Sequence, residues 1–382
     1  MKSYDVAVVG VGIVGASAIY ALARAGVRVV GIDAGIPGAG TSGTSFAWLN
    51  AVRKEPEAYH RLNADGMAAH RRLAKALGGD VGHHDGGSLE WAVGDEAQRE
   101  LRARVERLRA RGYAAEWITR ADARRFEPGL RFDDTVTEVA LFAGDGWLDA
   151  PRLIGRLIGD ASGRGAEILA ATAVRSLRML GDRIDAVIVD AGEMTVGSVL
   201  ICVGPATETF LTPLGITMPV GRVPGLLAVT SPPTEPLGHV VHAPGIHLRP
   251  DANGGLVLGA DDVDPLAAAA GSGARLTELA GLLLERAARV FPAASDVRII
   301  DRRVGVRPMP ADRQTIAGRI PGVSNGWVLA THSGVTLGPL LGELIANEIV
   351  AGTPRAELAL FRPERFPNLG TATTWRARVA RG

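Results

Sequence analysis

The feature that most constrains this fold is a glycine-rich turn close to the N-terminus. The segment 4–9, Tyr-Asp-Val-Ala-Val-Val, is short and β-branched, which is typical of a buried strand. It leads into Gly-Val-Gly-Ile-Val-Gly at 10–15, and good helix formers follow up to Arg24. Residues 27–33 indicate a second strand that ends in Asp33. The sequence therefore predicts a strand, turn, helix and strand within about 30 residues, which is one βαβ unit.

This unit has the residues that bind a dinucleotide. Gly10 permits a tight turn, Gly12 lets a pyrophosphate approach bare backbone, and Gly15 lets the helix pack closely on the strand. A pyrophosphate would lie at the helix N-terminus, where free N–H groups favour an anion. Asp33, eighteen positions after Gly15, can accept hydrogen bonds from ribose hydroxyls. We expect a bound dinucleotide, because a glycine turn without that role needs no acid at this position.

A second candidate cofactor segment lies at the other end of the chain. Residues 327–339, Trp-Val-Leu-Ala-Thr-His-Ser-Gly-Val-Thr-Leu-Gly-Pro, indicate a strand, a glycine loop and the start of a helix predicted over 339–351. A reduced flavin gathers negative charge at N1 and the C2 carbonyl, and a helix N-terminus stabilises that charge. The alternative is an ordinary strand, loop and helix that close the sheet. The second segment favours FAD over NAD as the dinucleotide.

Composition excludes several classes of protein. The 382 residues allow two to three domains at about 100–200 residues each. The 42 Lys and Arg residues nearly cancel the 41 Asp and Glu, so we expect no nucleic-acid partner. The single cysteine, Cys202, excludes an internal disulfide and a multi-cysteine metal site, and we expect no metal.

Three uncharged runs could be mistaken for membrane or signal segments. They span 6–23, 34–52 and 320–342, and glycines interrupt each of them. We therefore expect no transmembrane segment and no signal peptide, and a cytoplasmic location. Elsewhere, a proline-rich piece at 219–236 is predicted to precede strands around 239–249 and 255–259.

Taken together, the motifs resemble the FAD-dependent D-amino-acid oxidase superfamily over nearly the whole chain. The fingerprint at 10–15 with Asp33 is similar to the family's first cofactor motif, and 40–45, Gly-Thr-Ser-Gly-Thr-Ser, to its Gly/Ser loop. Val174 and Gly204 match the family's adenine-side valine and second glycine patch. The segment Val-Gly-Val-Arg-Pro at 304–308 is similar to the Gly-x-Arg-Pro strand, and 333–338 to the C-terminal flavin loop.

The resemblance implies a mixed α/β fold, with a Rossmann-type FAD-binding domain interleaved with a substrate domain on a mostly antiparallel sheet. It divides the chain into 1–80, 146–220 and 305–382 for FAD, and 81–145 and 221–304 for substrate. The motif and the resemblance assign these residues to FAD: Gly10, Gly12, Ile13, Val14, Gly15, Asp33, Ala34, Gly40, Thr41, Ser42, Ser45, Val174, Gly204, Ser333, Gly334, Val335, Thr336 and Leu337.

Three residues are candidates for the chemistry. The family's Gly-x-Arg-Pro arginine binds a substrate carboxylate, and Arg307 is its match; a guanidinium fork can pair both carboxylate oxygens. Arg303 is the reserve candidate, because strand alternation puts it on the same face as Arg307. His247 occupies the place where family oxidases often have a tyrosine, and His332 adjoins the flavin loop. Each histidine could serve either acid–base chemistry or packing.

Two departures from the family bear on redox chemistry. Sarcosine oxidases tether flavin through a C-terminal cysteine, and this chain has none there, so we expect non-covalent FAD. Some relatives activate oxygen with a lysine near flavin N5, whereas the lysines here are Lys2, Lys54 and Lys75. Their early positions leave oxidase and dehydrogenase open, so the electron acceptor is either O2 or another molecule.

The resemblance implies an enzyme that oxidises the C–N bond of a small amino acid or secondary amine carrying a carboxylate. Hydride would pass to flavin N5 and the imine would then be hydrolysed. Three alternatives are open: an NAD dehydrogenase, a flavin monooxygenase that uses NAD(P)H, and a non-catalytic flavin-binding protein. The sequence predicts neither the substrate's chirality nor the oligomeric state.

Overall fold

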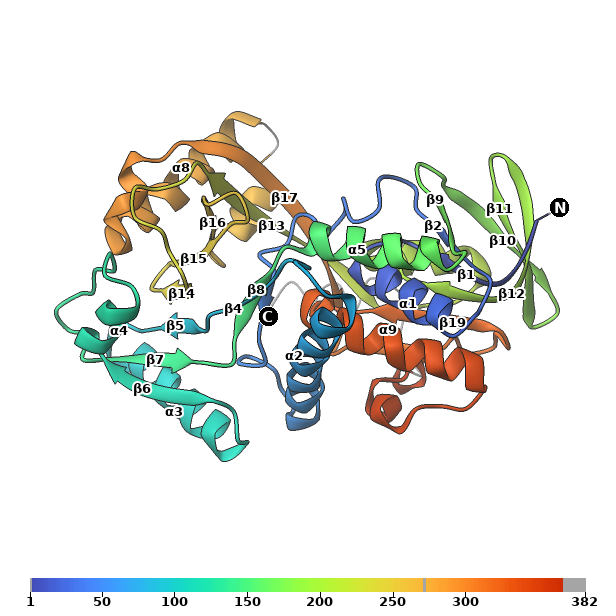
Figure 1. Ribbon diagram of the computed structural model, residues 1–382, viewed down its shortest axis with the longest axis horizontal. Coiled ribbons are helices and arrows are strands. Elements are labelled where there is room, and N and C mark those ends of the chain that lie inside the picture. The colour runs from blue at the N-terminus through green and yellow to red at the C-terminus, as the bar shows by residue number, and fades with distance from the viewer. Residues whose placement is uncertain (1, 271–272, 367–382) are drawn as a thin grey trace.

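A computed structural model describes residues 2–270 and 273–366 and places most of their strands in two large sheets (Figure 1). In the first sheet the order is β10 (Val174–Leu180), β11 (Arg183–Val189), β12 (Gly192–Ile201), β1 (Ser3–Val9), β2 (Val29–Ile32) and β9 (Glu167–Leu169), with β19 (Gly326–Ala330) beside β12 and β18 (Ile316–Arg319) beside β19. The predicted mixed α/β fold is confirmed.

The second sheet is mostly antiparallel and lies at the other end of the molecule (Figure 1). Its order is β17 (Ile299–Pro310), β13 (Val220–Thr230), β16 (Leu256–Gly259), β15 (Ile246–Pro250), β14 (Val240–Ala243), β5 (Ser88–Glu90), β7 (Glu138–Phe142) and β6 (Ala115–Thr119). A small sheet of β3 (Trp48–Leu49), β8 (Gly146–Leu148) and β4 (His83–Asp85) lies between the two large ones.

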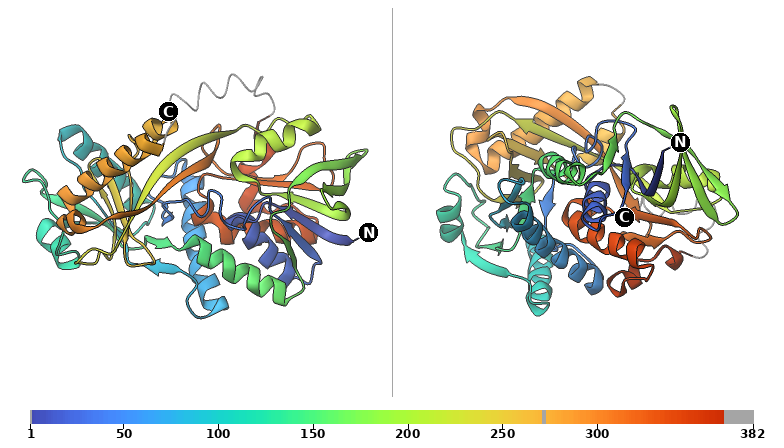
Figure 2. Two further views of the ribbon diagram at one scale, coloured as in Figure 1. Left: turned by 90° about the horizontal axis from the view of Figure 1, so that it is seen from above. Right: turned by 45° about the vertical axis from the view of Figure 1, so that its right-hand side comes forward.

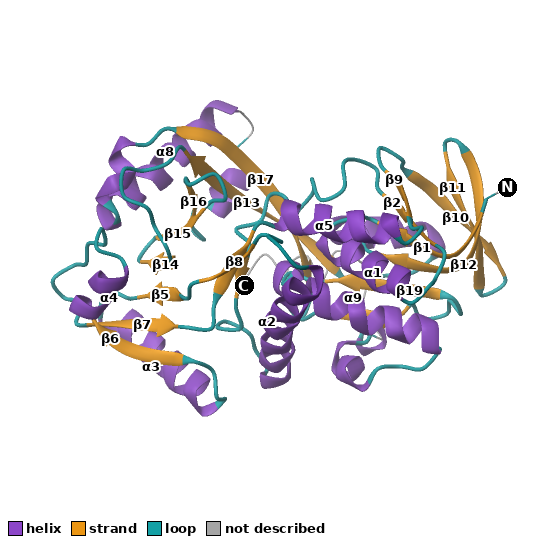
Figure 3. Ribbon diagram, viewed as in Figure 1, coloured by secondary structure: helices purple, strands orange, loops and turns teal. Residues whose placement is uncertain are grey.

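Helices cover both large sheets. They are α1 (Ile13–Arg24), α2 (Glu57–Leu77), α3 (Asp95–Ala110), α4 (Arg120–Phe126), α5 (Ala150–Gly163), α6 (Thr207–Leu211), α7 (Asp264–Ala268), α8 (Gly273–Val290) and α9 (Gly334–Ala351). On the first sheet, α1 lies between α5 and α9 (Figure 3). On the second sheet, α8 buries Leu279 and Leu283 in the same apolar cluster as Leu248 and Leu258 of the strands.

Parallel pairing in the first sheet brings the predicted cofactor segments together. Strand β1 runs parallel to both β2 and β12, and β12 runs parallel to β19. The carboxyl ends of parallel strands meet at one edge, and ligands of open α/β sheets bind there. The loops that leave this edge begin beside Gly10, Asp33, Gly204 and Ser333. These four segments therefore meet at one place, although the first and the last are more than 300 positions apart in the sequence.

Helix α9 is longer than the sequence predicts, since it begins at Gly334 and contains Pro339. Proline has no N–H, so Pro339 cannot bond the carbonyl of Val335 one turn earlier. The imidazole Nε2 of His70, in α2, lies 2.7 Å from that carbonyl oxygen. Burial lowers the pKa of His70 to about 4, so the ring is neutral and its Nε2–H donates to Val335. A side chain from another helix thus replaces the hydrogen bond that local rules require.

The proline-rich piece at 219–236 contains β13, which the sequence analysis missed. Pro224 lies opposite Val306 of β17, whereas β16 pairs with β13 only at Ala228 and Val229. Proline fits a strand where one side carries no ladder hydrogen bond. The paired strands β13 and β17 extend from the second sheet towards the first (Figure 2). Because β17 spans residue 305, it crosses a predicted domain limit, and the predicted domain ranges remain a prediction; residues 367–382 lie outside the described chain.

Helix α9 is also the one described helix long and apolar enough to cross a membrane by length and composition. Of its most apolar window, 61% is buried inside the protein. It packs on α1 and α2. Burial in this core accounts for its apolar composition.

The crossing of α1 and α9 depends on glycine. A Cβ at Gly342 would lie 2.5 Å from the backbone of Ser17, and one at Gly338 would lie 3.0 Å from Ile13. We predict that Gly342→Ala separates the helices and lowers the free energy of unfolding by about 1–3 kcal/mol. Gly281→Ala, in open space on α8, is the control and should raise stability by up to about 1 kcal/mol. Urea unfolding measures both, and equal stability of the two variants would contradict this packing argument.

Candidate active site

The glycine turn after β1 has no room for side chains. Gly10 has a φ of +90°, and a Cβ there would lie 2.5 Å from the carbonyl oxygen of Cys202. A Cβ on Gly15 would lie 2.0 Å from the carbonyl oxygen of Gly10. Both positions therefore require glycine, for backbone conformation and for close packing of α1 on the sheet.

The N-terminus of α1 offers free hydrogen-bond donors. The N–H of Ile13 donates to Ser42 Oγ at 3.0 Å. The N–H groups of Gly12 and Val14 have no acceptor among the described residues. Unpaired donors at a helix N-terminus, beside a glycine and a serine hydroxyl, suit a pyrophosphate. The residues present fit the predicted dinucleotide at this point.

Asp33 organises the neighbouring loop through its carboxylate. Oδ2 accepts from the N–H of Val11 at 2.8 Å, and Oδ1 accepts from the N–H of Gly35 at 2.9 Å. A carboxylate has about four acceptor positions, so each oxygen can still accept a ribose hydroxyl. The N–H of Thr172 donates to the Asp33 carbonyl, which brings the start of β10 and Val174 beside the acid. Ala34 is exposed in the same loop.

The loop 40–45 joins this region to the second sheet. Thr41 donates its hydroxyl to the carbonyl of Val306 at 2.5 Å. A Cβ on Gly305 would lie 2.6 Å from Thr44 Oγ1, so the loop touches β17 two residues before Arg307. Gly40 is exposed and Ser45 Oγ accepts from the N–H of Ala47.

The N-terminus of α9 lies against that of α1. A Cβ on Gly334 would lie 3.5 Å from the side chain of Val14. The hydroxyl of Tyr59 donates to Ser333 Oγ at 2.9 Å, and Thr336 Oγ1 donates to the carbonyl of Trp48 at 3.4 Å. Leu337 is fully buried, and its N–H donates to the carbonyl of Ser333 at 2.9 Å. Two helix N-termini thus face the same space, as the predicted flavin site requires.

The second sheet presents a row of polar residues on one face. His247 lies opposite His242 on the adjacent strand, and His242 lies opposite Glu90 on the next. Residues directly opposite across strands share a face. The Nδ1 atoms of the two imidazoles are 2.9 Å apart. The His242 ring packs on Trp48, and the centroids of the two rings are 4.0 Å apart. Because Trp48 follows the loop 40–45, this face looks towards the candidate cofactor space.

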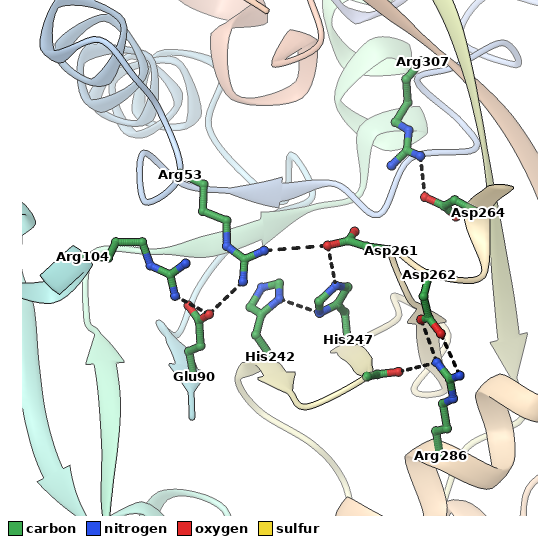
Figure 4. Close-up of polar contacts among 11 residues, drawn as sticks. Arg53, Glu90, Arg104, His242, His247, Asp261, Asp262, Asp264, Arg286 and Arg307 are labelled. Carbon is green, nitrogen blue, oxygen red and sulfur yellow. Dashed lines mark hydrogen bonds and ion pairs between the residues drawn. The ribbon is translucent and has the colours of Figure 1, made fainter. Parts of the chain in front are cut away.

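Ion pairs join this row to neighbouring elements (Figure 4). Arg53, after β3, lies 2.8 Å from Glu90 Oε1, which also accepts from Arg104 of α3. Arg53 also lies 3.8 Å from Asp261, and Asp261 lies 3.5 Å from His247 Nε2. Among these residues, the sequence predicted a role for His247 alone. No local motif marks the others, because strand register and loop packing bring them together.

Arg307 is held at one nitrogen and free at another. Its Nη2 donates to the carbonyl of Pro224 at 3.0 Å and to the Asp264 carboxylate. Its Nε is buried and has no partner among the described residues. The Nη1 nitrogen also has no partner among the described residues, and because the side chain is 33% exposed, Nη1 is the donor that a ligand can reach. The guanidinium is therefore fixed in position with a donor available.

His332 and Lys54 share an electrostatic environment with Arg307. Burial, helped by the charges of Lys54 and Arg307, lowers the pKa of His332 to about 3, so this ring is neutral at physiological pH. Burial lowers the pKa of Lys54 to about 8, and Lys54 has no hydrogen bond or ion pair with a described residue. The early position of Lys54 in the sequence concealed its proximity to the C-terminal loop.

The reserve candidate, Arg303, has partners of its own. It pairs with Asp301 and lines a cavity of about 520 Å³ together with Arg249, Ser42 and Ser45. Its partners thus differ from those of Arg307, and its role as the reserve candidate stays a prediction. Within the described residues, no group of three or more His, Cys, Asp or Glu could hold a metal ion.

A buried acid, Asp145, connects the small sheet with the second sheet. It accepts hydrogen bonds from Trp48 Nε1 at 3.0 Å, from Ser88 Oγ at 2.7 Å and from the hydroxyl of Tyr113. Burial raises the pKa of Asp145 to about 7, in spite of these three donors.

This shift predicts a pH-dependent stability. Between about pH 4 and about pH 7 the folded protein keeps a proton on Asp145 that the unfolded chain has released. The free energy of unfolding should therefore fall as pH rises, by up to about 1.4 kcal/mol per pH unit from this group. Asp145→Asn should remove that slope. Urea unfolding of the native protein and of Asp145→Asn at about pH 5 and about pH 7 measures this slope. The same change in the free energy of unfolding in both proteins would disprove the assignment.

Comparison with known proteins agrees with this geometry. Residues 5–348 match the family described as FAD dependent oxidoreductase. Glycine oxidase from Geobacillus kaustophilus is 26% identical over 94% of this chain and 96% of that protein, and one of the opine oxidase polypeptides of Agrobacterium tumefaciens is 25% identical over 96% and 98%. The crystal structure of the Geobacillus glycine oxidase superposes with a TM-score of 0.84, at 25% identity, over 97% of this chain and all of that one. The chain therefore belongs to the family of FAD-dependent oxidoreductases, as its glycine turn and its second flavin loop predicted.

Proposed function

We propose that this enzyme oxidises the C–N bond of an amino acid, or of a secondary amine that carries a carboxylate. The observation that carries the proposal is the unpaired, accessible Nη1 of Arg307 on a guanidinium that Asp264 holds fixed. The names of the similar proteins, glycine oxidase and opine oxidase, support an amino-acid type of substrate. FAD, when bound, supplies the acceptor for the hydride, and the product imine is then hydrolysed to a carbonyl.

In this proposal the carboxylate of the substrate pairs with Arg307. Asp264 and the carbonyl of Pro224 occupy Nη2, which fixes the plane of the guanidinium and leaves Nη1 for the ligand. A fixed partner at the carboxylate orients the α-carbon, and orientation of this kind is a large part of catalysis. His247 lies on the same sheet face as the row that includes His242 and Glu90, and so forms part of the pocket wall.

FAD would be held at both of its ends without a covalent bond. Its diphosphate would meet Gly12 and Val14 at the start of α1, and its pyrimidine edge would meet Gly334 at the start of α9. The chain's single cysteine, Cys202, is buried beneath the glycine turn, so it offers no tether to the ring. His332 is neutral, so it can shape the pocket or donate one hydrogen bond through its single N–H. It is not an imidazolium that could act as a general acid at neutral pH.

The electron acceptor is O2 or another molecule. The early sequence positions of the three lysines gave a reason to doubt a lysine beside the flavin. Lys54 removes that ground, since its charge acts on His332 beside the loop. A positive charge near the flavin stabilises its reduced form whichever acceptor takes the electrons. A cytoplasmic location remains a proposal, supported by the burial of most of the uncharged segments 6–23 and 320–342 in the protein core.

Anaerobic reduction tests the function. The purified protein should be yellow and should bleach with at least one member of a panel of glycine, sarcosine, D- and L-amino acids and cyclic imino acids. Arg307→Ala should weaken the binding of that substrate by about 10- to 100-fold, because a charge-assisted hydrogen bond is lost. It should leave the FAD content unchanged.

Arg302→Ala is the matched control, since this exposed arginine of β17 contacts Thr277 of α8. It should bleach as the native protein does. Bleaching by NAD(P)H, and by no amine, would instead favour a monooxygenase. Equal loss of substrate and FAD in Arg307→Ala would make that arginine structural.

A further inference from the structure

The loop that follows β16 carries two carboxylates with different surroundings. Asp264 accepts from Arg307 and from the N–H of Leu226, and its side chain is 13% exposed. Asp261 lies three residues earlier, and its side chain is 73% exposed. It points towards Arg53 and His247, into the group of charged residues in front of the second sheet (Figure 4).

The contacts of Asp261 are loose. The side-chain nitrogens that face it are His247 Nε2 at 3.5 Å and Arg53 Nη1 at 3.8 Å. Charge-assisted hydrogen bonds between nitrogen and a carboxylate are about 2.7–2.9 Å long. Neither neighbour therefore occupies the carboxylate fully. His247 nevertheless keeps the pKa of Asp261 at about 2, so the group is ionised at any physiological pH.

Asp261 is near enough to Arg307 and to His332 for its charge to act on both surroundings. The charge of Arg307 acts on Asp261, and the charge of Asp261 acts on His332. The other acids of the pocket are engaged: Asp264 binds Arg307, and Glu90 binds Arg53 and Arg104. Asp261 is thus the carboxylate of this pocket with the most capacity for an additional cation.

An amino acid bound through its carboxylate brings such a cation with it. Its ammonium group lies one carbon away from the carboxylate, and placing that charge in a partly desolvated pocket is costly unless an anion faces it. We propose that Asp261 binds the ammonium group of the substrate and so selects zwitterions over plain carboxylic acids. This inference rests on the proposed function, and it identifies the second charged contact of the same site.

Paired ligands test the inference directly. Glycine differs from glycolate, and alanine from lactate, only in having an amine in place of a hydroxyl. Binding is measured by rapid mixing under anaerobic conditions, from the change in the oxidised flavin spectrum before any bleaching, so the readout precedes reduction of the flavin. Asp261→Asn should weaken the binding of the amino acids by at least about tenfold, because a charge-assisted contact is lost. The affinity for the hydroxy acids should stay the same or increase, because a charge of the same sign as their carboxylate is removed.

Asp262→Asn is the matched control. Asp262 adjoins Asp261 but forms two 2.8 Å contacts with Arg286 on α8, away from the pocket (Figure 4). This variant should bind both ligand classes as the native protein does. Asp261→Glu retains the charge and should restore preference for the amino acids. FAD content and thermal unfolding should be the same in all three variants, because both aspartates are exposed.

Two results would overturn the inference and are distinguishable from failure of the proposed function. If the native protein binds amino acids and Asp261→Asn binds them equally well, Asp261 does not contact the amine. If Asp261→Asn loses both ligand classes to the same extent, its effect is structural. If the native protein responds to no amino acid in the panel, the proposed function itself fails.

Discussion

The close contact between α1 and α9 determines where the rest of the site lies. Glycine at 338 and 342 lets α9 approach the backbone of α1 more closely than any side chain would allow. The two helices start at the same edge of the first sheet, one after β1 and the other after β19. Their N-termini therefore face one space, although they come from opposite ends of the chain. A bound anion or an electron-rich ring in that space meets two sets of backbone donors.

The sequence predicted what local backbone geometry requires. Gly10, Gly15 and Asp33 are identifiable because a tight turn, a close helix contact and a strand-end acid each need one residue type at a fixed spacing. The helix start at 339 was wrong for a physical reason: the rule for proline assumes that the freed carbonyl of Val335 stays unpaired, and His70 supplies its partner from α2. Such compensation by a distant residue leaves no local signal.

The charged pocket was harder to predict for a similar reason. Arg53, Glu90 and Asp261 lie far apart in the chain and meet only because of strand register and the path of two loops. The Gly-x-Arg-Pro motif identified Arg307, but strand alternation alone did not distinguish it from Arg303. The two arginines differ in their partners. Asp264 fixes Arg307, whose own Nε is buried and unpaired, whereas Asp301 pairs with Arg303.

A crystal structure of the protein with FAD and a bound amino acid would test the central claim most directly. The account predicts the diphosphate at the N–H groups of Gly12 and Val14, and the pyrimidine edge at the start of α9. The ligand's carboxylate should then lie within hydrogen-bond distance of Arg307 Nη1. A flavin that contacts only one of the two helix N-termini, or a carboxylate bound away from Arg307, would contradict it.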